Sequence, residues 1–226
     1  MTVAVLRVFI FSILPLLIGG VHIALDKTVT SRERRMEVLL LYLFALGVAA
    51  SGISGFFGHF FLSDIVAESI GWPSGNPFQL EVGFANLAIG ILGIIAVGRR
   101  DGFREATVIT VAVFGVGATI VHLMDIVQTG NLAPGNTVQN VSNLLKPALL
   151  IGILGASRRA ERKPDSEAGL PGFQEWRTPR IQSAWWVVIG VYAGFGVGFA
   201  IGQPVIATLL GFVAGAILAV ISLRRR

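Results

Sequence analysis

The basic residues of this chain are confined to a few polar segments, and this feature limits its fold more than any other. Of 18 Lys and Arg residues, all but Arg7 and Lys146 lie in four segments: 26–35, 99–104, 157–181 and 224–226. The apolar stretches between them run to roughly 17–25 residues, the length that a helix needs to cross about 30 Å of hydrocarbon. The pattern therefore predicts a polytopic helical membrane protein.

The composition agrees with this class. Hydrophobic residues make up 54% of the chain and charged residues 14%, against roughly 25% charged in a soluble domain. The formal charge of +5 does not indicate nucleic-acid binding, because the basic residues lie at helix ends on one side, as membrane topology requires. With no cysteine, any metal would need His, carboxylate or backbone ligands. The predicted partner is the lipid bilayer.

We predict an all-α transmembrane bundle of about seven spans, with the amino terminus outside and the carboxyl terminus cytoplasmic. The spans are 3–25, 36–62, 81–98, 104–127, 138–157, 184–201 and 203–222. The orientation follows from the positive-inside rule, because four basic residues follow the first span and only Arg7 lies near its other end. A cleaved signal peptide is the alternative for the first span, although no clear cleavage site lies near Ala24. The predicted location is the cell membrane.

The chain is expected to divide into three parts. Residues 1–157 form a five-helix core, with outer loops at 63–80 and 128–137 that are rich in turn residues. Residues 158–182 are polar, mixed in charge and interrupted by prolines, and form a cytoplasmic linker. Residues 183–226 form a transmembrane hairpin.

Glycines recur through this hairpin. They are Gly190, Gly194 and Gly198 at four-residue spacing, then Gly211 and Gly215 on the next span. Small residues at such a spacing let two membrane helices approach until their backbones touch. We predict that the two helices pack through these glycines, as in a glycine zipper. The alternative is that the same face assembles a homo-oligomer or binds a partner in a membrane complex.

Four ionisable residues fall inside predicted spans at a similar depth: His59, Glu81, His122 and Asp125. All lie within about 10 Å of the outer edge of the hydrocarbon. Each costs free energy if it faces lipid, so we expect them to face the bundle and share a polar pocket. His122 and Asp125 are three residues apart and share a helix face. His59 shares its face with glycines, which would admit a neighbouring helix.

Three interpretations of this group remain open. Two His and two carboxylates suit Zn²⁺, Fe²⁺ or Mn²⁺. The same side chains could exchange protons, because His titrates near neutrality. The third interpretation is structural: an interhelical hydrogen-bond cluster, with Glu81 as a negative charge at the amino end of its helix.

Further polar candidates for the pocket are Asn86, Asn143 and Lys146. Asn86 is expected to make an interhelical hydrogen bond. Asn143 could add an amide and Lys146 a cation, unless the lysine side chain extends to the membrane surface.

The segment 71–94, read GWPSGNPFQLEVGFANLAIGILGI, occurs together with GHFF at 58–61, GATIVH at 117–122 and APGN at 133–136. Over about 36–157 the chain thereby resembles a family of bacterial and archaeal membrane proteins known only as a domain of unknown function. The resemblance implies a helical membrane fold and no activity.

These observations favour a small-solute or proton-linked membrane protein. A metal-dependent membrane enzyme using the same residues is the second hypothesis. The third is a non-catalytic accessory subunit that packs through its glycine-rich hairpin.

Overall fold

The computed structural model describes residues 3–161, 186, 189–190, 193–194, 197 and 203–224. The chain divides into two compact units: residues 2–170, and residues 171–226 together with Met1. Every regular element in the described residues is a helix. The all-α prediction is therefore confirmed for the part of the chain that is described.

Among the described residues, four helices are long and apolar enough to cross a membrane. The first runs through α1 (Val3–Val8), η1 (Phe9–Ile13) and α2 (Leu14–Leu25). The second runs through α3 (Arg32–Tyr42), η2 (Leu43–Ala50) and α4 (Ser51–Phe61). The third and fourth are α6 (Phe78–Val97) and α7 (Gly102–Thr129). Segments η1 and η2 are π-helical. The first and second helices are therefore continuous, but each contains a segment that is wider than an α-helix.

The remaining described elements are shorter or less apolar. They are α5 (Ser63–Ile70), α8 (Pro134–Thr137), α9 (Gln139–Glu161) and, in the second unit, α11 (Pro204–Arg224). The segments 63–80 and 128–137, which we predicted to be loops, each contain a short helix. These helices are α5 in the first segment and α8 in the second. Most of the predicted span 184–201 lies outside the described residues.

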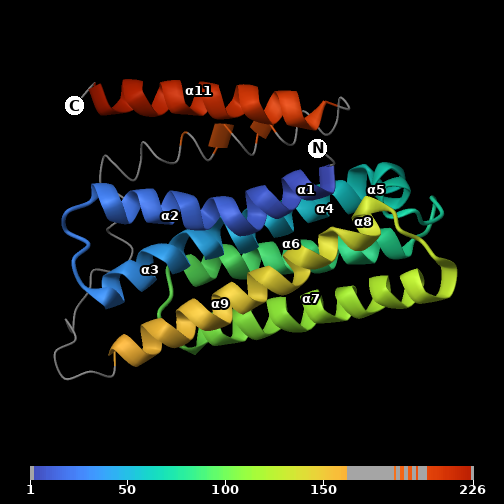
Figure 1. Cartoon of the computed structure of the whole chain (residues 1–226), viewed down its shortest axis with the longest axis horizontal. Helices are drawn as coiled ribbons and strands as arrows, with labels where there is room; N and C mark the ends of the chain where they lie inside the picture. The colour runs from blue at the N-terminus through green and yellow to red at the C-terminus, as the bar shows by residue number, and fades with distance from the viewer. Residues whose placement is uncertain are drawn as a thin grey trace. The chain divides into compact units, whose positions relative to one another are not determined.

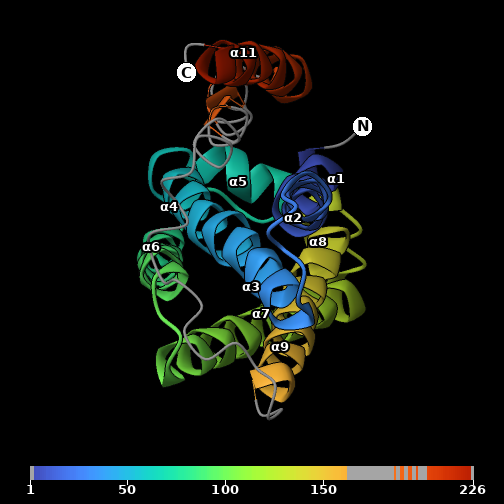
Figure 2. The ribbon, with the colours of Figure 1, turned by 90° about the vertical axis from the view of Figure 1, so that its left-hand side faces the viewer.

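The second helix lies at the centre of the first unit (Figure 2). In its most apolar window 61% of residues are buried, against 28–33% in the other three spans, so it packs against helices on several sides. It contacts α6 along one side and α2 and α9 along others. The buried apolar core gathers around it from α3, η2, α6, α7 and α9: Leu40, Leu43, Phe44, Val48, Ala96, Val108, Val111, Leu150 and Leu154.

Glycines set how closely α4 and α6 approach. A Cβ atom on Gly52 would lie 2.5 Å from Gly90 N, and one on Gly93 would lie 2.6 Å from Ala49 N. Such distances leave no room for a side chain, so backbone meets backbone at this crossing. The expectation that glycines on the His59 face admit a neighbouring helix is confirmed.

The basic segments of the first unit lie at one of its two ends (Figure 1). The connections 26–31 and 98–101 and the carboxyl end of α9 lie at one end, here named the basic end, and α5 and α8 lie at the other. At the basic end, Asp101 caps α7 by accepting a hydrogen bond from Phe103 N at 3.1 Å. Hydrogen bonds from the Arg99 guanidinium and from the Phe103 amide hold the pKa of Asp101 below its usual range.

A buried ion-pair network ties helices together at the basic end. Arg104 is 3% exposed and Glu37 7% exposed, and Arg104 Nη1 donates to both carboxylate oxygens at 2.9 Å. Arg100 Nε lies 3.2 Å from the same carboxylate, and Ser157 Oγ donates to it over 3.0 Å. Arg104 Nε donates to the carbonyl of Ala96. One carboxylate thus joins α3, α7, α9 and the connection before α7.

Candidate functional site

The last turns of α7 carry two of the four predicted ionisable residues, His122 and Asp125. Asn136 of α8 bridges them: its Oδ1 lies 2.7 Å from His122 Nδ1, and its Nδ2 donates to Asp125 Oδ2 over 2.9 Å. Asn136 is 0% exposed and His122 is buried. The amide therefore pairs with a ring nitrogen that would otherwise lie unpaired, and it gives the carboxylate of Asp125 one of its donors.

Two further side chains complete this cluster. Trp72 Nε1 and Asn131 Nδ2 donate to the same oxygen of Asp125, at 2.9 and 2.8 Å. The indole of Trp72 also stacks on the ring of His122, with 5.3 Å between centroids. We name Trp72, His122, Asp125, Asn131 and Asn136 the loop clamp, because they hold the connection between α5 and α6, and the segment that follows α7, to the last turns of α7. Its geometry favours the structural interpretation of this pair.

His59 and Glu81 are placed differently. His59 Nδ1 hydrogen-bonds Gln79 Oε1, which lies in the first turn of α6 and is buried. Glu81 is exposed. No hydrogen bond or ion pair in the described part of the chain links either residue to the loop clamp. The structure brings together His122 and Asp125 but does not gather all four predicted residues into one cluster.

The metal hypothesis gains no support from this arrangement. Within residues 3–161 and the described part of the hairpin, no three His, Asp or Glu side chains form a group that could hold a metal ion. His59 and His122 each direct one ring nitrogen to an amide instead. A divalent ion remains a prediction from the sequence, and metal analysis of the purified protein tests it.

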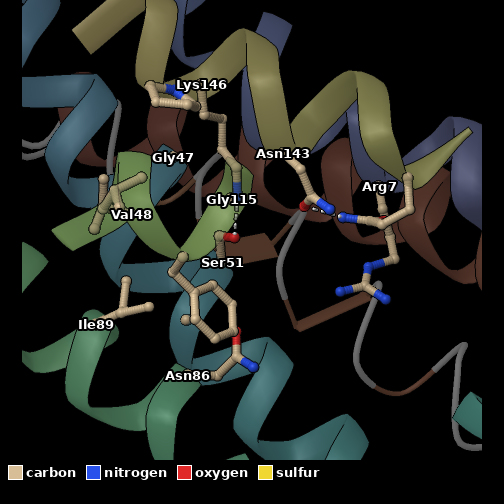
Figure 3. A pocket seen from close by; sticks show the side chains of 14 residues that line it. Arg7, Gly47, Val48, Ser51, Asn86, Ile89, Gly115, Asn143 and Lys146 are labelled. Atoms are coloured by element: carbon tan, nitrogen blue, oxygen red, sulfur yellow. Dashed lines mark hydrogen bonds between the residues drawn. The ribbon is translucent and has the colours of Figure 1, made fainter. Parts of the chain in front are cut away.

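A separate pocket lies within the helices of the first unit (Figure 3). It holds about 60 Å³ of space that the centre of a water-sized molecule can reach, and residues of η2, α4, α6, α7, α9 and the first helix line it. The polar side chains on its wall are Arg7, Ser51, Asn86, Gln139, Asn143 and Lys146. None of the four ionisable residues discussed above lines it.

All three of the further polar candidates, Asn86, Asn143 and Lys146, are on this wall. Lys146 Nζ donates to Ser51 Oγ over 2.8 Å and so joins α9 to α4 (Figure 3). Asn86 Nδ2 donates to a carbonyl one turn earlier in α6. On α7, a Cβ atom at Gly115 would collide with the carbonyl oxygen of Asn143, so glycine lets α9 pack closely here.

The sequence analysis missed Arg7 as a pocket residue and treated it only as a topology signal. Arg7 and Lys146 are the two basic residues that lie outside the polar segments, and both are half-buried on the pocket wall. Their position outside the four polar segments was the feature of the sequence that could have identified both as pocket residues. What the sequence lacked was the rotation of each helix, which decides whether such a side chain faces lipid, the surface or a neighbouring helix.

The backbone beside the pocket is irregular. Segment η1 begins two residues after Arg7, and η2 supplies Gly47 and Val48 to the wall. The two π-helical segments contact each other, since a Cβ atom on Gly47 would lie 3.1 Å from Phe11 O. π-Helical turns are rare in proteins and occur frequently at functional sites.

The hairpin glycines lie in the second unit. A Cβ atom on Gly190 would collide with the carbonyl oxygen of Gly211, and one on Gly194 with that of Ala207. Gly215 is close to Gly190, with its Cα 2.9 Å from the same Cβ position. Gly198 lies outside the described residues. These positions are compatible with packing between the two helices, and assembly with another subunit stays a prediction.

A family model described as a family of unknown function (DUF6790) covers residues 6–163. The match reaches into the first helix, which the resemblance over 36–157 had left out. No curated protein and no solved structure matches the chain.

Proposed function

Because the chain belongs to DUF6790, a family of unknown function, and its described part has four helices long and apolar enough to cross a membrane, we propose that it is a multi-pass membrane protein that binds a small polar solute. The binding site is the pocket between Arg7 and Lys146. Helix α9, which is less apolar than these four helices, supplies three of the six polar side chains on the wall.

The observation that carries this proposal is where the polar side chains lie. Membrane helices bury polar groups only when those groups are satisfied or functional. The pocket wall draws polar residues from the first helix, α4, α6 and α9 toward one space, whereas the loop clamp is a closed set of hydrogen bonds. A space with polar walls among apolar helices suits a small hydrated or charged solute.

A pocket-filling substitution tests the proposal. Ser51→Leu places an apolar side chain on the pocket wall, and Ser54→Leu, one turn later in α4 and outside the wall, is its matched control. We expect a panel of neutral, cationic and anionic solutes to contain at least one that raises the melting temperature of the purified protein. At 100 times the dissociation constant the rise should be roughly 5–10 °C.

Ser51→Leu should abolish this rise and Ser54→Leu should retain it. A panel in which no solute stabilises the protein would contradict the proposal. So would a rise that Ser51→Leu leaves unchanged.

We further propose seven spans with the amino terminus outside. The basic segments 26–35 and 99–104 meet at one end of the first unit, which supports a cytoplasmic location for that end. Since the chain has no cysteine, single cysteines report on sidedness directly. A cysteine replacing the exposed Ser74 should react with an impermeant thiol reagent in intact cells, and one replacing the exposed Thr30 should react only after lysis. The reverse labelling pattern would overturn the orientation.

A further inference from the structure

The pocket between Arg7 and Lys146 is positively charged, and no acidic side chain among the described residues lines it. We infer that its ligand is a small oxyanion of the carboxylate or phosphate type, bound between these two cations. This inference rests on the proposed function and adds the chemical class of the solute.

Other partly or fully buried cations of the first unit show how this protein balances charge elsewhere. Arg104 and Arg100 both lie against the carboxylate of Glu37, at 2.9 and 3.2 Å. Arg158 lies 2.7 Å from a carboxylate oxygen of Glu105. In the described residues, neither Arg7 nor Lys146 has such a partner. Lys146 Nζ donates only to a neutral hydroxyl, and Arg7 makes no ion pair there.

An unbalanced cation among membrane helices is costly, and a second cation on the same pocket wall adds repulsion. An anion placed between them removes both penalties at once. Since the described residues supply no anion to the wall, a ligand is the source of counter-charge that we propose. A neutral or cationic ligand would leave the repulsion in place.

The other groups on the wall suit an oxyanion. Arg7 offers a planar fork of N–H donors that matches two oxygens, and Lys146 offers a compact point charge. Because the oxygen of Ser51 accepts from Lys146, its own proton is free to be donated into the pocket. The amides of Gln139 and Asn143 can add neutral donors.

Such an oxyanion could come from solution or from a lipid headgroup, and the depth of the pocket favours solution. Lys146 lies seven residues into α9, or about 10 Å along its axis. Ser51 lies ten residues before the end of α4, or about 15 Å. A lipid phosphate rests at the membrane surface and would have to be drawn well into the hydrocarbon.

The test exchanges sodium chloride for sodium acetate or sodium phosphate at constant ionic strength, with the protein in neutral detergent, while the melting temperature is measured. Glycerol and tetramethylammonium chloride serve as neutral and cationic probes. We expect only the oxyanions to give a stabilisation that Ser51→Leu removes, since general effects of a solute on stability are the same in both proteins. Arg7→Gln and Lys146→Gln should each weaken their affinity about 10–100-fold. Lys146→Arg should retain binding, and the exposed Lys27→Gln should leave it unchanged.

A second measurement needs no ligand. Lys146→Met removes one unbalanced charge and should raise the melting temperature of the ligand-free protein. A lower melting temperature would overturn the claim that this charge is unbalanced.

The outcomes separate the inference from the proposed function. If glycerol or tetramethylammonium stabilises the protein through a site that Ser51→Leu destroys, and the oxyanions do not, the oxyanion inference is wrong and solute binding stands. If no probe of any charge binds, both are wrong. Stabilisation by phosphatidylglycerol, but not by phosphatidylcholine, acetate or phosphate, would support the inference that the ligand is an oxyanion. It would overturn the inference that this oxyanion comes from solution.

Discussion

Glu37→Gln is expected to lower the free energy of unfolding by about 3–5 kcal/mol, the usual cost of removing one partner from a buried ion pair. The substitution keeps the shape of the side chain but removes the charge that balances Arg104, which is 3% exposed. Arg100 loses its carboxylate partner as well. Thermal and denaturant unfolding of the purified protein in detergent measures the effect.

Glu105→Gln is the matched control at the same end of the unit. The side chain of Glu105 is 41% exposed in its ion pair with Arg158, and an exposed pair contributes only about 0–1 kcal/mol. The double variant Glu37→Leu, Arg104→Leu should recover much of the loss, because it removes both charges together. Equal losses in Glu37→Gln and Glu105→Gln would contradict a buried network.

Asn136→Ala is expected to destabilise the protein by roughly 2–4 kcal/mol, because it leaves the buried ring nitrogen of His122 without a partner and removes a donor to Asp125. The fully buried amide also donates to Asn131 O over 2.8 Å. The segments that the loop clamp holds should then open. Faster amide hydrogen exchange in 71–77 and 130–138 would report this opening.

Gln128→Ala is the control for this substitution. Gln128 is exposed on α7 close to the loop clamp, so its replacement should change stability by no more than about 0.5 kcal/mol. If Asn136→Ala leaves exchange in 71–77 at its original rate, the loop clamp does not hold that segment.

The helices of the first unit follow from the apolar stretches, but their ends depend on local contacts. Helix α3 begins at Arg32 rather than at the predicted 36, because Ser31 Oγ accepts a hydrogen bond from Arg34 N and caps the helix. Helix α9 runs to Glu161, beyond the predicted 157, and Arg158 pairs with that glutamate. Helices α5 and α8 were missed because they are short, lie among turn residues and pack on each other.

The partners of the ionisable residues were less predictable. His122 and Asp125 share a face of α7, as their spacing required, yet the side chain that joins them comes from α8. His59 faces α6, as its glycine neighbours indicated, but its partner there is Gln79. An amide looks the same in the sequence whether it lies on the surface or accepts a hydrogen bond from a buried ring.

By itself, the sequence determined that this chain is a helical protein suited to a membrane, because the length and spacing of apolar stretches follow from the rise of a helix and the thickness of the hydrocarbon. It also marked Arg7 and Lys146 as the two exceptions to the charge pattern. Only the tertiary structure placed these two cations on one pocket wall, 139 positions apart in the chain (146 − 7). The placement of both cations on this wall depends on the rotation of each helix and on which helices are neighbours. Close packing at residues such as Gly52 and Gly115 decides both.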